Sequence, residues 1–150
     1  MVENITDNEL KRNITDEILH KLPDWFEVEE SIQEYINTAD KKYTLAYKDN
    51  DKYIGFIAIE DIDDETCEIS VMGVLNESHR GGIGTLLVKN ALDYAKEKGF
   101  RYIIVKTVEY GKYAEYDITN MFYRKCGFEE YEKLDIWGED NPCQVYRMKI

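Results

Sequence analysis

Residues 78–88, with the sequence SHRGGIGTLLV, place three glycines within four positions directly before a run of aliphatic side chains. Glycine permits tight turns and lets a ligand approach main-chain N–H groups without a Cβ in the way. At the start of a helix these N–H groups lack intrahelical acceptors and lie at the positive end of the helix dipole. The segment therefore predicts a turn that opens a helix and binds phosphate. A glycine-rich turn without a ligand is the alternative.

The hydrophobic periodicity on both sides of this turn predicts a mixed α/β domain. The first 40 residues favour helices on either side of a connection at 22–26, with Thr15 as the expected N-cap of the first helix. A period of two then indicates an antiparallel meander of strands. The expected ranges are a short strand at 2–5, helices at 15–22 and 27–40, strands at 43–48, 53–62 and 67–75, a helix at 83–98 closed by Gly99, a strand at 101–107, a helix at 114–125, and strands at 129–137 and 143–150.

The helix expected at 114–125 carries two stripes of side chains. One stripe is apolar, and the other has polar tips at positions i, i+4 and i+7. Such a polar-tipped stripe suits either amphipathic packing or a binding site. The two stripes are formed by Ile118, Met121 and Phe122, and by Tyr116, Asn120 and Tyr123.

Length and composition limit the function further. The chain has 150 residues and 43% hydrophobic residues, which suits a single domain over 1–150. No segment approaches the roughly 18 apolar residues that span a bilayer, and the N-terminus is polar, so a cytoplasmic protein without a membrane partner is expected. The net charge of -12 argues against nucleic-acid binding and favours a cationic partner, although an acidic surface also serves solubility. Cys67, Cys126 and Cys143 form no CxxC motif, so neither a disulfide framework nor a metal site is expected.

The spacing after the glycines excludes two common phosphate motifs. A P-loop requires Lys-Ser/Thr after its last glycine, whereas Thr85 and Leu86 follow Gly84. A dinucleotide fingerprint that starts at Gly82 would need a small residue where Leu87 stands. The phosphate-binding interpretation therefore needs a different motif.

Segment 74–87, VLNESHRGGIGTLL, resembles the pyrophosphate-binding motif of the GNAT superfamily of N-acetyltransferases, Arg/Gln-x-x-Gly-x-Gly/Ala. His79, Gly82 and Gly84 take its first, fourth and sixth positions, and the histidine departs from the usual arginine or glutamine. The strand before the motif, the helix after it, segment 101–107 and the late stretch NMFYRKCGF are also similar to the ordered core of the family.

The resemblance implies a GNAT-like, mostly antiparallel, twisted sheet of six or seven strands with one parallel pair, flanked by about four helices. It also implies acetyl-CoA as co-substrate. Tyr123 is then the general acid near the cofactor sulfur, and Glu68 is the candidate general base, although an exposed strand glutamate is the other reading. Main-chain N–H groups near Gly73 and Val74 are the implied oxyanion donors. The implied cofactor-binding residues are Met72, Gly73, Val74, His79, Arg80, Gly81, Gly82, Ile83, Gly84, Thr85 and Asn120.

In similar proteins, the connection between the first two helices lines the acceptor site. Here that connection contains Trp25 and Phe26 among several carboxylates, which suits a cationic amine. The same aromatics could instead simply close the core. The sequence thus predicts an enzyme that acetylates a primary amine of a small cationic molecule by direct attack in a ternary complex. A weakly catalytic CoA-binding module and a protein acetyltransferase are the alternatives, and a homodimer is a further expectation from the family.

Overall fold

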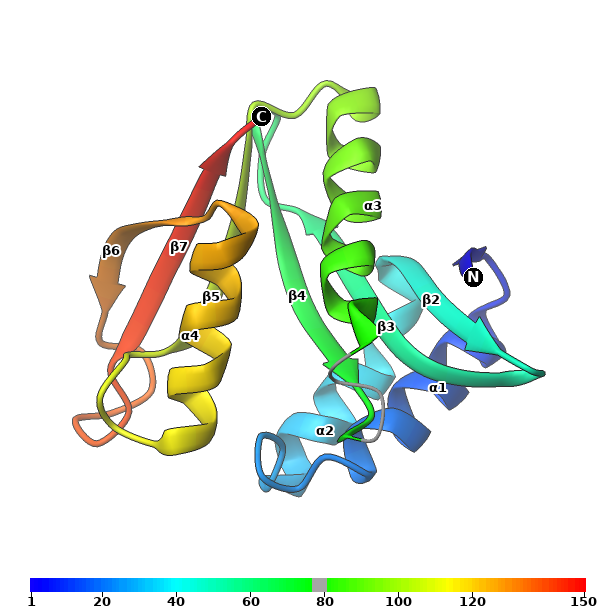
Figure 1. Cartoon of the computed structure of the whole chain (residues 1–150), viewed down its shortest axis with the longest axis horizontal. Coiled ribbons are helices and arrows are strands. Elements are labelled where there is room, and N and C mark those ends of the chain that lie inside the picture. Colours follow the sequence, from blue (N-terminus) through cyan, green and yellow to red (C-terminus); the bar gives the residue numbers. More distant parts are fainter. Residues whose placement is uncertain (77–80) are drawn as a thin grey trace. The chain divides into compact units, whose positions relative to one another are not determined.

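The computed structural model describes residues 1–76 and 81–150, and the chain forms two compact units (Figure 1). Unit 1 comprises residues 1–60 and 70–94, and unit 2 comprises residues 61–69 and 95–150. The elements are β1 Val2–Ile5, α1 Asn8–His20, α2 Glu29–Asn37, the short 3-10 helix η1 Ala39–Lys41, β2 Tyr43–Asp49, β3 Lys52–Asp61, β4 Thr66–Val74, α3 Ile83–Lys98, β5 Tyr102–Val108, α4 Ala114–Cys126, β6 Glu129–Leu134 and β7 Cys143–Lys149.

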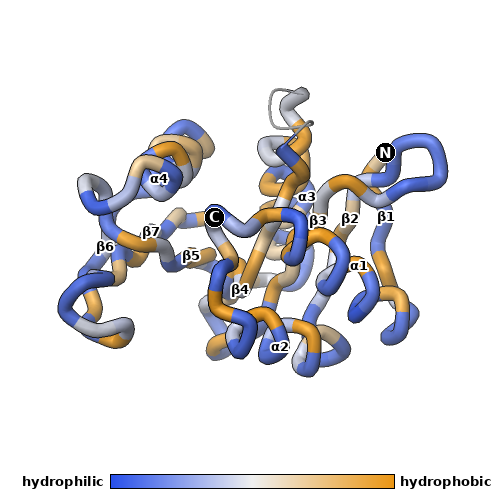
Figure 2. The backbone as a smooth tube through the Cα atoms, turned by 90° about the horizontal axis from the view of Figure 1, so that it is seen from below, coloured by the Kyte–Doolittle hydropathy of each residue, from blue (hydrophilic) through white to orange (hydrophobic). Residues whose placement is uncertain are grey.

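Within the described residues, the strands form a seven-stranded sheet in the order β1-β2-β3-β4-β5-β7-β6. β4 and β5 are parallel, whereas β1–β2, β2–β3, β5–β7 and β6–β7 are antiparallel. The predicted GNAT-like sheet with one parallel pair is therefore confirmed. Figure 2 shows that the hydrophobic residues concentrate in the central strands, whereas the connecting turns are largely hydrophilic.

The strands of unit 1 begin as an antiparallel meander, as the alternation predicted. Asn50 and Asp51 connect β2 to β3 with φ of 50° and 66°. Asparagine and aspartate adopt this left-handed region more readily than most residues, and two successive positive φ values match the twist of a hairpin. The turn thus sets the β2–β3 register, which a bulge shifts between Tyr47 and Lys48.

The first helix starts earlier than the sequence pattern predicted. Its N-cap is Asp7, whose side chain accepts a hydrogen bond from the Leu10 N–H at 2.8 Å. Thr15, the predicted cap, lies inside the helix, where its hydroxyl donates to the Lys11 carbonyl at 2.8 Å. The prediction was wrong because residues 8–14 mix polar and apolar side chains and so show no clear helical periodicity. They are nevertheless helical, and Ile14 among them is buried at 3% exposed.

The third helix has the predicted bounds and faces. Leu87 and Ala91 are fully buried, and the ring of Tyr94 stacks on Tyr43 with centroids 3.7 Å apart. Lys89, Asp93, Lys96 and Glu97 are exposed, as predicted. Gly99 follows the helix with φ of +88° and closes it, because a left-handed residue ends the helical ladder and glycine adopts that conformation without strain.

Unit 2 is built on β5. The strand pairs in parallel with Thr66–Ile69 of β4 and in antiparallel with the whole of β7. α4 ends at Gly127, which has φ of +105° and donates its N–H to the Arg124 carbonyl. The chain then returns through β6 to β7, so α4 is fixed by its connections to both β5 and β6.

Candidate functional site

The glycine-rich turn leads into α3 with an exposed opening and a buried anchor. Gly81 and Gly82 are exposed, whereas Ile83 is 8% exposed and Leu87 is fully buried. Gly82 has φ of +75°, and a Cβ placed on it would meet no atom of the described residues within 4 Å. Its carbonyl accepts the Leu86 N–H at 3.0 Å, which forms the first turn of the helix. The main chain at the start of α3 is therefore accessible, and two of the motif residues, His79 and Arg80, lie outside the described residues.

Gly55 on β3 brings the start of α3 and the end of β4 together. A Cβ at this position would lie 3.3 Å from side-chain atoms of Ile83, Leu87 and Val74. The missing side chain therefore lets the helix and the strand end approach the same point of β3. An isolated glycine inside a strand pattern is a signal of close backbone approach, so this contact could have been found from the sequence.

Gly73 near the end of β4 provides space for α1. A Cβ added there would lie 3.0 Å from Leu22 Cδ1 and 3.1 Å from Ile18 Cγ2. Contacts this short force neighbours to move, so the glycine permits the close packing of the strand against the helix. β4 pairs with β5 from Thr66 to Ile69. Among the described residues, this pairing does not extend to Ser70–Val74. The predicted oxyanion donors are thus in the part of β4 that follows this pairing.

Glu68 is buried rather than exposed. Its side chain is 10% exposed, and its Oε2 lies 3.4 Å from the Nζ of Lys106 on β5. The reading of Glu68 as an exposed strand glutamate was therefore wrong. On the same face of β4, the hydroxyl of Ser70 accepts a hydrogen bond from the Lys42 ammonium at 2.7 Å. Glu68 and Lys106 form their ion pair within unit 2, whereas Ser70 and Lys42 belong to unit 1.

The polar-tipped stripe of α4 is the one that faces inward. Asn120 is fully buried and Tyr123 is 5% exposed, whereas Ile118 and Met121 are 66% and 46% exposed. The Tyr123 ring packs against Phe122, Phe128 and Tyr146 with centroids 5.4 to 6.2 Å apart. Residue hydrophobicity alone would bury the apolar stripe instead. The polar-tipped stripe is buried because its polar atoms find hydrogen-bond partners.

Asn120 holds α4 to the neighbouring strands through a hydrogen-bond network. Its amide donates to the carbonyls of Val108 at 2.8 Å and Tyr116 at 2.7 Å, and its side-chain oxygen accepts the Tyr146 hydroxyl at 2.5 Å. Arg124 donates in turn to the Tyr146 oxygen at 3.2 Å. The structure thus assigns Asn120 to positioning the helix that carries Tyr123. Its predicted contact with the cofactor remains a prediction.

We expect Asn120→Ala to lower the free energy of unfolding by about 1–3 kcal/mol, because the Val108 carbonyl and the Tyr146 hydroxyl would lose buried partners. Chemical denaturation of the variant and the wild type measures this difference. Thr119→Ala is a matched control one position earlier, since the Thr119 hydroxyl donates at 3.2 Å to the Glu115 carbonyl one turn before it on the same helix. An equal stability of Asn120→Ala and wild type would contradict the assigned role.

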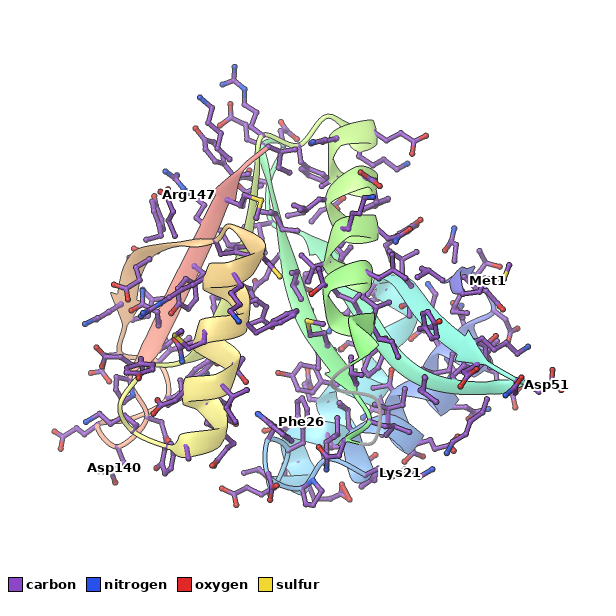
Figure 3. All side chains as sticks on the ribbon, in the orientation of Figure 1. Met1, Lys21, Phe26, Asp51, Asp140 and Arg147 are labelled. Atoms are coloured by element: carbon purple, nitrogen blue, oxygen red, sulfur yellow. The ribbon has the colours of Figure 1, made fainter. Side chains whose placement is uncertain are left out.

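The connection between α1 and α2 forms a separate pocket within unit 1. Trp25 and Phe26 are half-buried, and the Phe26 ring meets Tyr35 edge-on with centroids 6.4 Å apart. Phe26, which is labelled in Figure 3, also borders an open pocket of about 270 Å³. The pocket is lined by His20, Pro23, Phe26, Glu27, Glu29 and Ile32. An aromatic ring and two carboxylates, those of Phe26, Glu27 and Glu29, therefore border this space.

Comparison with known proteins settles the family. Residues 12–128 match the model of the acetyltransferase (GNAT) family. The chain belongs to the GNAT acetyltransferase family. This GNAT protein is also 35% identical over 97 residues to Probable N-acetyltransferase 14 of Xenopus tropicalis, a match that covers 64% of the chain and 47% of the relative. The chain therefore spans about half the length of that relative.

Solved structures of low sequence identity share the fold of this GNAT protein. An aminoglycoside 6'-N-acetyltransferase in complex with coenzyme A matches with a TM-score of 0.78 and 18% identity over 99% of this chain and 96% of that chain. Ard1 from Thermoplasma volcanium matches with a TM-score of 0.78 and 14% identity over 100% of this chain and 97% of that chain. At such identities the matches show the fold alone.

The predicted site residues of this GNAT protein fall into three groups. The end of β4 and the start of α3, with Met72–Val74 and Gly81–Thr85, meet at Gly55 in unit 1. Trp25 and Phe26 lie at the α1–α2 connection of the same unit. Glu68, Asn120 and Tyr123 belong to unit 2, where the last two share one face of α4.

Other types of site have little support in the structure. Burial raises the pKa of the Cys67 thiol to about 11, so this thiol is protonated near neutral pH and is no ready nucleophile. In the part of the chain that the structure describes, no three His, Cys, Asp or Glu side chains are grouped so that they could hold a metal ion. Among those residues, no helix has the length and apolarity needed to cross a membrane.

Proposed function

We propose that this GNAT protein is an acetyl-CoA-dependent N-acetyltransferase that acetylates a primary amine of a small cationic molecule. The observation that carries the proposal is the exposed start of α3, which lies beside the end of β4 in a chain of the GNAT family. The aminoglycoside enzyme with the same fold was solved with coenzyme A, which supports the choice of co-substrate. Transfer would occur by direct attack in a ternary complex.

The first role of the chain is to bind the co-substrate, which supplies an acetyl group activated as a thioester. The main-chain N–H groups of 81–85 would bind the diphosphate, together with His79 and Arg80. The space around the Cβ position of Gly82 supports this fit, because the main chain there can be approached without steric hindrance. Main-chain groups of Met72, Gly73 and Val74 would hold the pantetheine arm and donate hydrogen bonds to the oxyanion.

The second role is to move two protons. An aliphatic amine is protonated at neutral pH, so Glu68 would accept a proton, directly or through water, before the amine attacks. Tyr123 would then donate its hydroxyl proton to the sulfur as the C–S bond breaks, and the second proton that the nitrogen loses in forming the amide would restore the hydroxyl. The acceptor would be held by Trp25 and Phe26 of the α1–α2 connection, where the neighbouring carboxylates attract a cation.

A protein acetyltransferase is the second candidate. Ard1 from Thermoplasma volcanium matches with the same TM-score, 0.78, as the aminoglycoside enzyme, so the fold does not separate the two classes. Location in the cytoplasm, a single domain over 1–150 and a homodimer remain predictions.

The test measures release of the CoA thiol from acetyl-CoA in the presence of spermidine, kanamycin or a lysine-containing peptide. The proposal expects release that depends on one of the two small amines. Thiol release only with the peptide would favour a protein acetyltransferase. If CoA binds in a calorimeter but no acceptor causes thiol release, both acetyltransferase functions would be overturned and a CoA-binding module would be indicated.

A further inference from the structure

His20 joins the ends of two helices in unit 1. It is the last residue of α1, and Glu29 is the first residue of α2. Its Nε2 lies 2.7 Å and 2.8 Å from the two carboxylate oxygens of Glu29. Its Nδ1 lies 2.6 Å from the Asp16 carboxylate and 2.8 Å from the Asp16 carbonyl. One imidazole ring therefore connects the last turn of α1 with the first turn of α2.

The chemistry of these contacts requires a protonated ring. All four oxygens are carbonyl or carboxylate acceptors, so each ring nitrogen has to donate, and only imidazolium has two N–H donors. The hydrogen bond to Glu29, followed by that to the Asp16 carbonyl, raises the pKa of His20 from 6.5 to about 9. The helix dipoles add to this, because a cation is favoured at the C-terminus of α1 and an anion at the N-terminus of α2.

The ring lies beside the segment that the proposed function assigns to the acceptor. His20 borders the same pocket as Pro23, Phe26 and Glu27. Within the connection, the N–H groups of Trp25 and Phe26 donate to the Leu22 carbonyl at 3.2 Å and 3.0 Å, and Leu22 is 2% exposed. One end of the connection is thus anchored in the core, whereas its other end is tied to α1 by His20.

We propose that His20 is a positioning residue, which holds the α1–α2 connection in the conformation that presents Trp25 and Phe26 to the acceptor amine. The part that concerns the acceptor rests on the proposed function. The charged groups around the ring are Asp16 on α1, Glu29 on α2 and Glu27 in the connection. At a pH above the pKa of His20, the ring loses its positive charge and one of its two N–H donors.

The test compares His20→Gln with the wild type by hydrogen exchange and by kinetics. The amides of Trp25 and Phe26 are expected to exchange about fivefold faster in the variant, since an exposed ion pair contributes up to about 1 kcal/mol. The KM for the better acceptor of spermidine and kanamycin is expected to rise about fivefold, with the KM for acetyl-CoA unchanged. Lys21→Gln is the matched control, because Lys21 pairs with Glu17 of the same helix at 3.1 Å.

The pH dependence gives a second measurement. A pKa raised in the folded state adds stability below about pH 6.5 and loses it as the pH rises through about 9. The wild type is therefore expected to unfold at a higher temperature than His20→Gln at about pH 6, with the difference shrinking by about pH 10. Equal hydrogen-exchange rates of the Trp25 and Phe26 amides in His20→Gln and wild type would overturn the proposed role of His20. Faster exchange with an unchanged KM for the acceptor would overturn it as well. If the wild type acetylates no amine, the proposed function fails, whereas the exchange comparison still decides whether His20 holds the connection.

Discussion

Replacing Tyr123 by phenylalanine is expected to lower kcat for acetyl transfer by about 10- to 10,000-fold. The upper part of this range is the usual effect of one acid–base group, and the lower part applies if the CoA thiolate leaves without a proton donor. The phenylalanine keeps the aromatic packing on Phe122, Phe128 and Tyr146 but has no proton to give to the leaving sulfur. Steady-state thiol release at saturating acetyl-CoA and amine measures kcat. Calorimetry with CoA is expected to give an unchanged affinity.

Tyr146→Phe is the matched control for this experiment. It removes the hydroxyl that donates to Asn120, so we expect a loss of about 1–3 kcal/mol in the free energy of unfolding. Its kcat is expected to fall far less than that of Tyr123→Phe at a temperature where both proteins are folded, because the change weakens the network that positions α4 but leaves the Tyr123 hydroxyl in place. A Tyr123→Phe enzyme with wild-type kcat would exclude Tyr123 as the general acid.

Replacing Gly82 by valine is expected to weaken the binding of acetyl-CoA by about 10- to 100-fold, or about 1.4–2.8 kcal/mol. Gly82 has φ of +75°, and an L residue in the left-handed region is strained by about 1–2 kcal/mol or more. The valine would relax this strain by moving the turn, or it would place its methyl groups over the start of α3. Either change displaces the N–H groups that we propose to bind diphosphate, and calorimetry with CoA measures the effect.

Gly99→Val provides the comparison at the other end of α3. Gly99 has φ of +88°, and a Cβ there also meets no atom within 4 Å in the part of the chain that the structure describes, so the two substitutions bring similar backbone strain. We expect both variants to lose stability in thermal unfolding, but only Gly82→Val to lose affinity for CoA. If both variants bind CoA as the wild type does, the glycine turn is not the diphosphate site.

The order of the elements could be predicted because each is specified by nearby residues. The bounds of α3 follow from an aliphatic run between glycines at both ends, and the β2–β3 hairpin follows from alternation around Asn50 and Asp51. The start of α1 could not be predicted. Its first turn mixes charged and apolar residues, and its cap at Asp7 competes with other capping residues such as Thr15.

The candidate site divides in the same way. The glycine turn at 81–84 is a local signal, so the proposal for the diphosphate could be made from these residues and their resemblance to the GNAT motif. Asp16 meets His20 within one helix, but Glu29 meets it only when the connection returns α2 to the end of α1, so the sequence did not predict that His20 joins the two helices. The burial of Glu68 and its ion pair with Lys106 likewise depend on the parallel pairing of β4 with β5.

The sequence by itself determined the type and order of the elements, the glycine turn and the resemblance to the GNAT superfamily, since each rests on residues close together in the chain. Only the tertiary structure decided which face of α4 is buried, because that choice depends on whether Asn120 finds partners on Val108 and Tyr146. It also decided that His20 joins two helices. A polar side chain is stable inside a protein only when distant segments satisfy its hydrogen bonds, and the positions of distant segments are a property of the fold.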